Sequence, residues 1–386
     1  MNKKARVIAF YLPQFHPIPE NDKWWGKGFT EWTNVGKAKP LFRGHYQPRV
    51  PADLGYYDLR MPEVREAQAQ LARKAGIEGF CYWHYWFGNG KQLLERPFNE
   101  VLESGKPDFP FCLGWANHSW KTGTWAREGK LCESQMIAEQ VYLGEEDYKM
   151  HFKYVLKAFR DNRYIMVDGK PIFVIFDPYS LPVDFIPYWQ NLAKDSGLNG
   201  IHFVAYSQNT SGRGLKIGDE VIAKGLYATN EVDKYYDYLI KKLNFDAVVA
   251  LGAWRAESCY SNRLMFMLHR QLCARFKLNY ILKYDYAKVM RHYYTDEEKR
   301  ENVYPTLLPQ WDRSPRSSIN GIYINSTPQK FKDTIKMALS LLENKNEEHK
   351  ILFLKSWNEW AEGNYVEPDL KYGHGYLDAI KETIIE

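Results

Sequence analysis

Two glutamates near the end of the chain have a spacing that suits acid–base chemistry. Glu359 and Glu362 lie three residues apart in the stretch 355–369, directly after the apolar run 351–354. On a turn of helix or a helix-like loop, side chains at this spacing project to the same side. Two carboxyl groups that share one small volume can divide the work of a reaction, because one can be protonated while the other is ionised. The sequence therefore offers Glu359 and Glu362 as a candidate catalytic pair.

The elements that must position this pair form a repeated strand and helix pattern. Short apolar runs, typical of strands buried on both faces, occur at residues 6–12, 79–87, 111–115, 171–176, 201–206, 245–251, 304–308 and 351–354. Helix-forming segments lie between several of them, at residues 62–75, 92–103, 145–160, 184–193 and 331–342. Eight strands that alternate with helices predict an α/β fold, a right-handed (β/α)8 barrel of the TIM type. We expect a single domain over residues 1–386, with long loops after the strands.

The segment between the sixth and seventh predicted strands is rich in aromatic residues, Met, Arg and Lys. It predicts a helical insertion around residues 255–300, within which residues 259–294 look amphipathic. One interpretation is a weak membrane-surface association, since basic residues interleaved with apolar ones suit an interfacial helix. The preferred interpretation is the sixth crossover helix plus a lid, because four acidic residues dilute the positive charge: Asp285, Asp296, Glu297 and Glu298.

Composition and charge argue against several classes of protein. A formal net charge of +5 over 386 residues, with no long block of one sign, argues against a nucleic-acid-binding protein. No window reaches the ~18 to 20 apolar residues that a membrane span requires, and the apolar run after Lys3 and Lys4 is too short for a secretory signal. The five cysteines form no CxxC pair and indicate free thiols in a reducing compartment. We expect a soluble, cytoplasmic protein whose oligomeric state the sequence leaves open.

Aromatic residues make up 16% of the chain, including 13 Trp and 28 Tyr. Their flat faces and polar edges suit stacking on sugar rings, and packing in a large core explains them equally well. In a barrel of this kind the active site lies at the carboxyl ends of the strands, where the loops converge. The residues that we expect to contact a substrate there are Tyr11, His16, Trp32, His84, Trp86, Trp115, Asn117, His118, Asp177, Trp311, Asn358, Trp360 and Glu367.

Paired carboxyl groups among aromatic and hydrogen-bonding side chains are what glycosidic-bond chemistry requires. One acid protonates the leaving oxygen, while a carboxylate handles the positive charge that develops on the sugar. An isolated pair of glutamates at this spacing is more often a solvated surface turn. The position of Glu359 and Glu362 after the last predicted strand, among aromatic residues, favours a site instead.

Metal and nucleotide sites have less support in the sequence. His16, His84 and His118 follow three successive strands, yet no HxH or HExxH spacing accompanies them. We expect these histidines to bind sugar hydroxyl groups rather than a metal. Neither GxGxxG nor GxxxxGKS/T occurs, so the sequence predicts no phosphate-cradling loop and no cofactor.

Three stretches of the chain resemble a known family. They are AFYLPQFH at residues 9–16, WWGKGFTEWTN at residues 24–34 and WNEWAEG at residues 357–363. They resemble the WbsX family of bacterial polysaccharide-biosynthesis proteins, usually labelled glycosyltransferases, and the resemblance covers nearly the whole chain. That family is similar in turn to the endo-α-mannosidases of glycoside hydrolase family ninety-nine, which share the barrel and an NEWxEG loop.

The resemblance implies separate roles for the two glutamates. Glu359 would act on the sugar's own 2-hydroxyl group, and Glu362 would be the general acid/base. The outcome would be retention of configuration through an anhydro intermediate, without a covalent glycosyl-enzyme. The chain differs from the endo-mannosidases at Ala361, where they have His, so the resemblance leaves the substrate open.

Together these observations predict a metal-independent enzyme that acts on a glycosidic bond. We expect its partner to be an oligosaccharide or polysaccharide, a mannose-like cell-surface polysaccharide or O-antigen intermediate. Hydrolysis is preferred over transfer because the chain has no nucleotide-phosphate motif. One alternative is a glycosyltransferase of lipopolysaccharide or O-antigen biosynthesis, and a second is a carbohydrate-binding barrel without catalytic activity.

Overall fold

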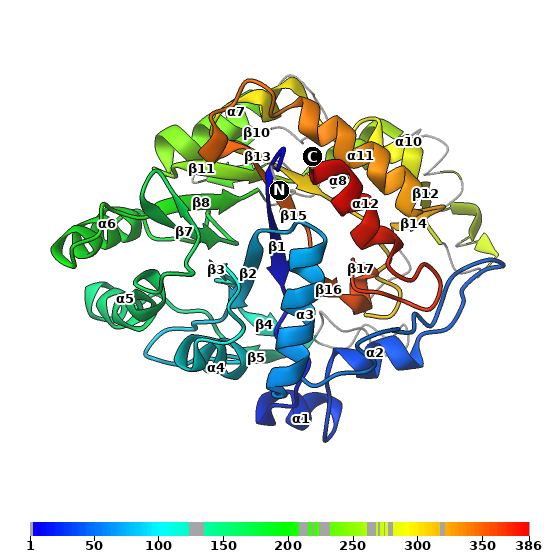
Figure 1. Ribbon diagram of the computed structural model, residues 1–386, viewed down its shortest axis with the longest axis horizontal. Coiled ribbons are helices and arrows are strands. Elements are labelled where there is room, and N and C mark those ends of the chain that lie inside the picture. Colours follow the sequence, from blue (N-terminus) through cyan, green and yellow to red (C-terminus); the bar gives the residue numbers. More distant parts are fainter. Residues whose placement is uncertain are drawn as a thin grey trace.

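A closed barrel of parallel strands organises the structure, a computed structural model (Figure 1). It describes residues 3–122, 135–207, 215–217, 220–223, 232–260, 268, 271–273, 275–276, 281–316 and 321–385. The barrel strands are β1 (Arg6–Tyr11), β2 (Gly79–His84), β3 (Phe111–Trp115), β7 (Lys170–Ile175), β8 (His202–Tyr206), β11 (Ala247–Ala250), β13 (Val303–Leu307) and β15 (Ile351–Leu354). Their order is β3-β2-β1-β15-β13-β11-β8-β7, and β7 also pairs with β3, which closes the barrel. The predicted (β/α)8 fold is confirmed.

Helices between the strands surround the barrel (Figure 1). They are α3 (Pro62–Lys74), α4 (Arg96–Ser104), α5 (Glu145–Phe159), α6 (Phe185–Asp195), α7 (Val232–Asp237), α8 (Ala253–Tyr260), α10 (Tyr286–Met290), α11 (Pro328–Ser340) and α12 (Gly375–Ile384). Helices α3 and α11 begin with proline, whose missing N–H costs nothing at the first helical position. The helix predicted at residues 92–103 begins later, at Arg96, which places Pro97 in its first turn. The strand predicted at residues 79–87 ends at His84.

Shorter elements extend the loops and the ends of the barrel. Near the carboxyl ends of the strands lie α1 (Pro19–Trp25), α2 (Glu31–Lys37), β4 (Trp120–Lys121), β5 (Met136–Ala138), β16 (Asn358–Glu359), η6 (Trp360–Glu362) and β17 (Asn364–Tyr365) (Figure 1). The others are β6 (Met166–Val167), β9 (Leu215–Ile217), β10 (Glu220–Ala223), η3 (Tyr238–Lys242), β12 (Lys283–Asp285), η4 (Asp296–Lys299), β14 (Ile322–Ile324) and η5 (Glu347–His349). The long loops that the sequence predicts after the strands therefore carry secondary structure of their own.

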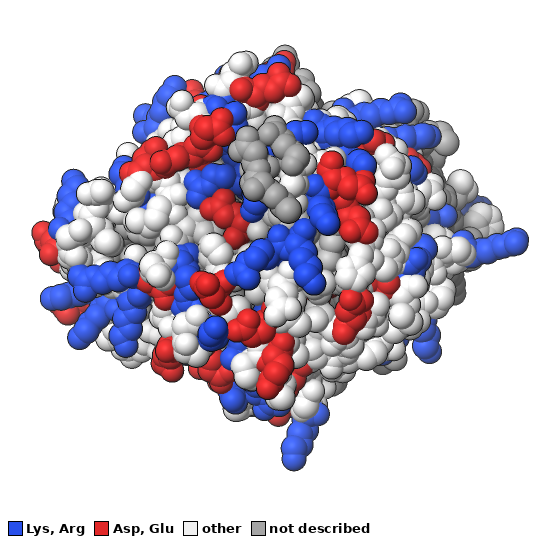
Figure 2. All heavy atoms as spheres, in the orientation of Figure 1, with Lys and Arg blue, Asp and Glu red and all other residues white. Residues whose placement is uncertain are grey.

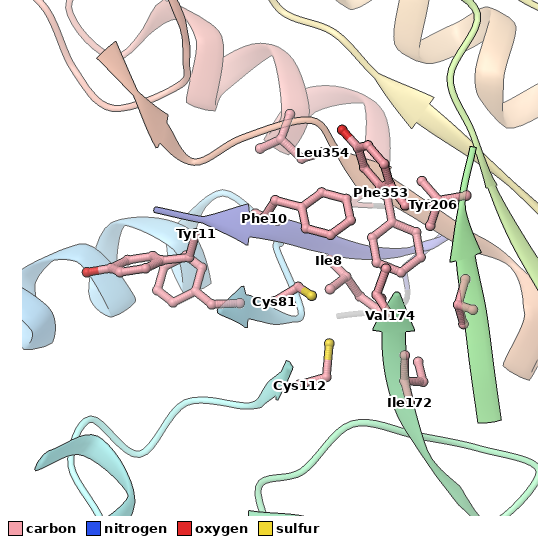
Figure 3. Packing of buried hydrophobic residues seen from close by; sticks show 14 of the residues in the cluster. Ile8, Phe10, Tyr11, Cys81, Cys112, Ile172, Val174, Tyr206, Phe353 and Leu354 are labelled. Atoms are coloured by element: carbon pink, nitrogen blue, oxygen red, sulfur yellow. The ribbon is translucent and has the colours of Figure 1, made fainter. Parts of the chain in front are cut away.

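Side chains of the barrel strands alternate between the inside and the outside of the wall. Phe10 points inward, where its ring centre lies 4.7 Å from that of Trp83, 5.4 Å from Tyr206 and 5.2 Å from Phe353. Its neighbour Tyr11 points the other way, toward the surrounding helices (Figure 3). This alternation decides which residues at the strand ends face the interior of the barrel.

The predicted insertion around residues 255–300 is described only in part. Helices α8 and α10 belong to it, and β12, which precedes α10, pairs in parallel with β14. Most of residues 261–280 lie outside the described residues, and with them the central part of the amphipathic stretch 259–294. The membrane-surface association therefore stays a prediction. Among the described residues, no helix has the length and apolar character needed to cross a membrane.

Charged side chains of both signs are interspersed over the face shown in Figure 2. Among the described residues of this face, neither sign gathers into a large continuous patch. This mixing is expected of a chain that has 52 basic and 47 acidic residues and no long block of one sign.

Candidate active site

The candidate catalytic pair lies on a tight hairpin after the last barrel strand. Asn358 and Glu359 of β16 pair in antiparallel fashion with Tyr365 and Asn364 of β17, and the 3₁₀ turn η6 joins the two strands. Side chains three residues apart on such a turn lie on one side. Gly363 follows the turn with a φ of 56°, and a Cβ atom there would lie 2.9 Å from Cβ of Asp312. Only glycine therefore fits this position without a shift of the backbone.

A single arginine joins the two carboxylates. Nη1 of Arg316 lies 2.8 Å from Oε1 of Glu359 and 3.0 Å from Oε1 of Glu362. Nε of Arg313 lies 3.2 Å from the same oxygen of Glu362. The exposed fraction of the side chain is 12% for Glu359 and 8% for Glu362, so the pair is nearly buried. The two carboxyl groups thus share one small volume, as their spacing in the sequence predicts.

The two carboxyl groups differ in how readily they hold a proton. Burial raises the pKa of Glu359, and the negative charge of Glu362 adds to the effect. Burial acts in the same sense on Glu362, but Arg313, Arg316 and Lys355 outweigh it and lower the pKa of Glu362 to about 2. The two groups are close enough to influence each other. In this state Glu359 is the one that accepts a proton first.

A half-buried lysine approaches the pair from the end of the last strand. Nζ of Lys355 lies 5.6 Å from the ring centre of Tyr206 and 5.7 Å from that of Trp311. Burial opposes the charge on Lys355, yet Tyr206, Glu359 and Glu362 together raise its pKa above the ordinary value. Lys355 is therefore a fixed positive charge at the inner end of the site.

A third carboxyl group faces the same arginine from the N-terminal part of the chain. Glu31 is the first residue of α2, and its side chain is fully buried, with 0% exposed. Oε1 of Glu31 lies 3.5 Å from Nη2 of Arg316, and within the described residues neither carboxylate oxygen of Glu31 has a hydrogen-bond partner. Burial raises the pKa of Glu31 to about 7, against the opposing charge of Arg316. At neutral pH this group stands close to its midpoint of ionisation.

Glu367 fixes the position of the hairpin through side-chain hydrogen bonds. Its carboxylate accepts four hydrogen bonds of 2.6 to 2.9 Å, donated by Trp357 Nε1, Trp360 Nε1, Tyr57 OH and Gln68 Nε2. Gln68 in turn accepts a hydrogen bond of 2.6 Å from the hydroxyl group of Tyr11. Three residues predicted to bind substrate, Tyr11, Trp360 and Glu367, therefore form a network that positions the loop.

Two further networks fix the position of the hairpin. The side chain of Asn358 accepts from the backbone N–H of Leu12 at 2.8 Å and donates to its carbonyl oxygen at 3.0 Å, which ties the hairpin to the end of β1. On the opposite side, the N–H of Asp312 donates to the carbonyl oxygen of Glu362 at 2.7 Å. His45 Nε2 and Gln47 Nε2 lie 2.8 and 2.7 Å from Oδ2 of Asp312. The candidate catalytic pair is thus held by both neighbouring loops.

Aromatic residues of the predicted set pack on the hairpin and beside Arg313. The indole of Trp360 stacks on Tyr365 with ring centres 3.8 Å apart, and Trp32 packs 5.3 Å from Trp360. Trp311 is partly exposed, and its ring centre lies 5.9 Å from the guanidinium carbon of Arg313. Trp32 therefore packs against the hairpin, and Trp311 lies beside Arg313 and Lys355, two of the charges that act on Glu362.

Three other predicted residues pack between the barrel and α5. Nε2 of His84 lies 2.8 Å from Nε2 of His151, and the ring of Trp86 stacks on His151 with centres 4.6 Å apart. Trp115 Nε1 donates to the carbonyl oxygen of Trp86 at 2.9 Å. Burial lowers the pKa of His84 to about 3. His84, Trp86 and Trp115 are thus neutral packing residues here, because side-chain alternation turns them away from the barrel interior.

The remaining predicted residues lie at the rim. The side-chain amide of Asn117 donates to the carbonyl oxygen of Asp177 and accepts from its N–H, at 2.8 and 2.7 Å, which links the ends of β3 and β7. Burial lowers the pKa of His118 to about 4, and the charge of Arg316 adds to this shift. Nδ1 of His16 lies 3.1 Å from the carbonyl oxygen of Pro13. Within the described residues, no group of three or more His, Cys, Asp or Glu side chains could hold a metal ion.

The sequence analysis overlooked four charged residues of this site: Glu31, Arg313, Arg316 and Lys355. Lys355 follows β15 directly, and Arg313 and Arg316 lie in the loop after β13, so attention to every charged residue in these two loops would have found them. Glu31 stands within the stretch 24–34 that carries the family resemblance. Only the packing of α2 against the hairpin brings Glu31 to the pair, and nothing local in the sequence signals it.

Comparison with known proteins places the chain in a family. The family described as "Glycosyltransferase WbsX" matches residues 7–380. Two curated relatives from Xanthomonas campestris pv. campestris, strains B100 and ATCC 33913, are each 34% identical over 384 residues and carry the name "Uncharacterized protein WxcX". The alignment covers 98% of this chain and 50% of each relative, so the chain spans about half the length of these proteins.

Two solved structures share the fold. The endo-alpha-mannosidase of family GH99 from Bacteroides thetaiotaomicron has a TM-score of 0.52 and 14% identity, with 99% of this chain and 96% of that chain covered. A structure described as a glycoside hydrolase-like protein has a TM-score of 0.56 and 14% identity, with 99% of this chain and 94% of that one covered. At this identity the likeness concerns the barrel and the order of its elements.

Proposed function

Because this chain belongs to the WbsX glycosyltransferase family, we propose that it is a carbohydrate-active enzyme with Glu359 and Glu362 as its catalytic pair. One observation carries the proposal: two nearly buried carboxylates share Nη1 of Arg316, at 2.8 and 3.0 Å, at the carboxyl end of the last barrel strand. In barrel enzymes this end holds the active site. The partly exposed ring of Trp311, beside Arg313 and Lys355, suits the apolar face of a sugar.

The proposed reaction is hydrolysis of a glycosidic bond in a mannose-like cell-surface polysaccharide or O-antigen intermediate. Glu359 takes the proton of the sugar's 2-hydroxyl group, whose oxygen then attacks the anomeric carbon. At the same time Glu362 gives its proton to the leaving oxygen. In the second half, Glu362 takes a proton from the attacking water and Glu359 returns one to the 2-oxygen, so that the configuration is retained. Each carboxyl group ends the cycle as it began.

These roles set a condition on the charges in the site. A general acid must carry a proton near the working pH, whereas Arg313, Arg316 and Lys355 lower the pKa of Glu362 to about 2. Glu362 therefore becomes an acid only when part of this positive charge moves away from it. The sugar that enters between the two carboxylates has to occupy the volume that Arg316 spans in the free site.

The decisive experiment uses Glu359→Gln and Glu362→Gln. With a panel of defined mannosides and lipid-linked oligosaccharides, followed by mass spectrometry, we expect each substitution to lower turnover by about 10²- to 10⁴-fold. The melting temperature should stay nearly unchanged, because glutamine preserves the volume of the side chain. NMR of the first anomer released should show retention. Glu63→Gln, an exposed first-turn residue of α3, is the matched control; wild-type turnover in both site variants would refute the proposal.

Transfer to a second sugar is the other candidate, and the description of the family as a glycosyltransferase favours it. The same carboxylate pair would then pass the sugar to an acceptor hydroxyl group instead of water. Calorimetry with a nucleotide-sugar or a polyprenyl-linked sugar as donor separates the two, since a transferase must bind such a donor. We propose a cytoplasmic location for the hydrolase and for the transferase alike. The free thiols of Cys81, Cys112, Cys259 and Cys273 agree with a reducing compartment.

A further inference from the structure

Arg316 contacts three carboxyl groups with the two ends of one guanidinium. Nη1 lies at hydrogen-bond distance from Glu359 and Glu362, whereas Nη2 lies 3.5 Å from Oε1 of Glu31. A charge-assisted N–H···O bond is normally about 2.7–2.9 Å long. Nη2 is therefore close enough to Glu31 for a change in the side-chain torsions of Arg316 to complete a bond there. A guanidinium that turns fully to Glu31 gives up its bonds to Glu359 and Glu362.

The burial of Glu31 in this way lowers the stability of the fold. Its side chain has no exposed surface, and within the described part of the chain its carboxylate accepts no hydrogen bond. A buried ionisable group without partners opposes folding. An apolar or amide side chain at the start of α2 would avoid that loss of stability. The presence of a carboxyl group is explained if a hydrogen-bond donor reaches it in another state of the site.

The catalytic pair needs such a second state. While Arg316 lies between Glu359 and Glu362, it occupies the volume that a sugar must enter, and it favours the ionised form of Glu362. When the guanidinium leaves, its charge has to remain compensated in a nearly buried site. Glu31 is a buried carboxylate whose Oε1 already lies 3.5 Å from Nη2 of this guanidinium.

We propose that Glu31 is a positioning residue that receives Arg316 when a sugar enters between Glu359 and Glu362. The arginine alternates between two docking positions, the catalytic pair in the free enzyme and Glu31 in the occupied enzyme. The transfer opens the volume between the carboxylates and leaves Glu362 able to hold the proton that it donates. This inference rests on the proposed function of the pair.

Other charged and titratable groups also face this cluster. Tyr85 lies near Glu31, Glu359 and Arg316, and His118 lies near Arg316. Arg313 and Lys355 act on Glu362, while Tyr206 acts on Lys355. Arg313 and Lys355 stay beside Glu362 when Arg316 moves, so the transfer removes one of the three positive charges that act on the acid.

A crystal structure of the double variant Glu359→Gln/Glu362→Gln tests the transfer without any ligand or turnover. Neutral amides attract the guanidinium less than carboxylates do. We expect Arg316 to turn to Glu31, with a distance of about 2.8–3.0 Å between Nη2 and a carboxylate oxygen. An arginine that still lies between positions 359 and 362, 3.5 Å or more from Glu31, would overturn the proposal. This result does not depend on whether the protein hydrolyses glycosides.

Kinetics of a double-mutant cycle give the second test, with the mannoside turned over in the screen described above. Glu31→Gln should lower kcat about tenfold and change KM less than twofold, and its basic pH limit should move to lower pH because Arg316 stays on Glu362. In an Arg316→Gln background, Glu31→Gln should cost less than about twofold, because the two residues act as a unit. Glu31→Asp, which keeps the charge, should recover part of kcat.

The cycle also separates this role from a purely structural one. If Glu31 only supported the fold, its replacement would cost the same in both backgrounds and would leave the pH profile in place. Equal costs in the two backgrounds, or an unchanged pH profile, would therefore refute the two-position arginine. If no mannoside is turned over by the wild-type enzyme, the proposed function fails and the crystal structure alone decides the inference.

Discussion

Glu367 and Glu31 are both buried glutamates whose pKa burial raises to about 7, yet their surroundings differ. The carboxylate of Glu367 accepts four hydrogen bonds, donated by Trp357, Trp360, Tyr57 and Gln68. The carboxylate of Glu31 accepts none among the described residues and faces one guanidinium at 3.5 Å. Glu367 bonds to the tryptophans of the hairpin, whereas Glu31 faces Arg316, which also binds Glu359 and Glu362.

The difference separates two roles that a buried carboxyl group can have. A carboxylate whose acceptor positions are filled resists any change that would empty them, so Glu367 holds the hairpin in one conformation. A carboxylate without donors costs free energy and gains from any donor that arrives. Glu31 is therefore suited to a site whose hydrogen bonds are exchanged, and Glu367 to a site whose hydrogen bonds stay in place.

Replacing Glu367 should have the largest effect on stability. Glu367→Ala leaves four buried donors without an acceptor, and at about 1–3 kcal/mol for each unsatisfied group the loss should reach about 4 kcal/mol or more. Urea unfolding followed by tryptophan fluorescence measures it. Glu343→Ala, at an exposed position after α11, is the control and should change the free energy of unfolding by less than about 0.5 kcal/mol. A loss below 1 kcal/mol for Glu367→Ala would remove the contrast with Glu31.

The pH dependence of stability should show a smaller effect that belongs to Glu31. A carboxyl group whose pKa rises from 4.5 to about 7 on folding binds more protons in the folded state, so its contribution is present at low pH and is lost between pH about 4.5 and 7. For Glu31 the loss is on the order of 1–3 kcal/mol. Thermal unfolding from pH 5 to pH 8 should therefore decline less steeply in Glu31→Gln than in the wild type. Parallel curves for the two proteins would show that Glu31 does not titrate in this range.

The smallest expected effect on stability comes from Arg313, whose side chain is 34% exposed. Arg313→Gln should lower the free energy of unfolding by about 1 kcal/mol or less, because Arg316 and Lys355 still compensate the charge of Glu362. Because Arg313 lowers the pKa of Glu362, its removal should raise that pKa and move the basic limit of the pH–rate profile to higher pH. The profile of kcat/KM measures this shift, and a shift to lower pH would contradict the role of Glu362 as the acid.

Much of the fold could be predicted from the sequence. Each of the eight apolar runs contains or overlaps a barrel strand, and the helices at residues 62–75 and 145–160 match α3 and α5 closely. These elements depend on neighbours along the chain, namely apolar runs, helix-forming residues and prolines at helix starts. The proximity of Glu359 and Glu362 was predictable for the same reason, because a spacing of three on a tight turn is a local property.

The side of the barrel on which a residue lies could not be predicted in this way. Trp83 and His84 are neighbours at the end of β2, but Trp83 packs on Phe10 inside the barrel and His84 pairs with His151 outside it. The strand is buried on both faces, so its sequence carries no polar alternation that would reveal the inner side. A histidine or tryptophan at the end of such a strand can therefore be a packing residue, as His84 is here.

By itself, the sequence determined the barrel and the position of the glutamate pair on its last loop, because both follow from patterns that are short along the chain. Only the tertiary structure decided which charges meet the pair. Arg316 comes from the loop after β13 and Glu31 from α2, and their contact depends on how these loops pack over the barrel. Charges act across space, and the chain brings them together only when the barrel has closed.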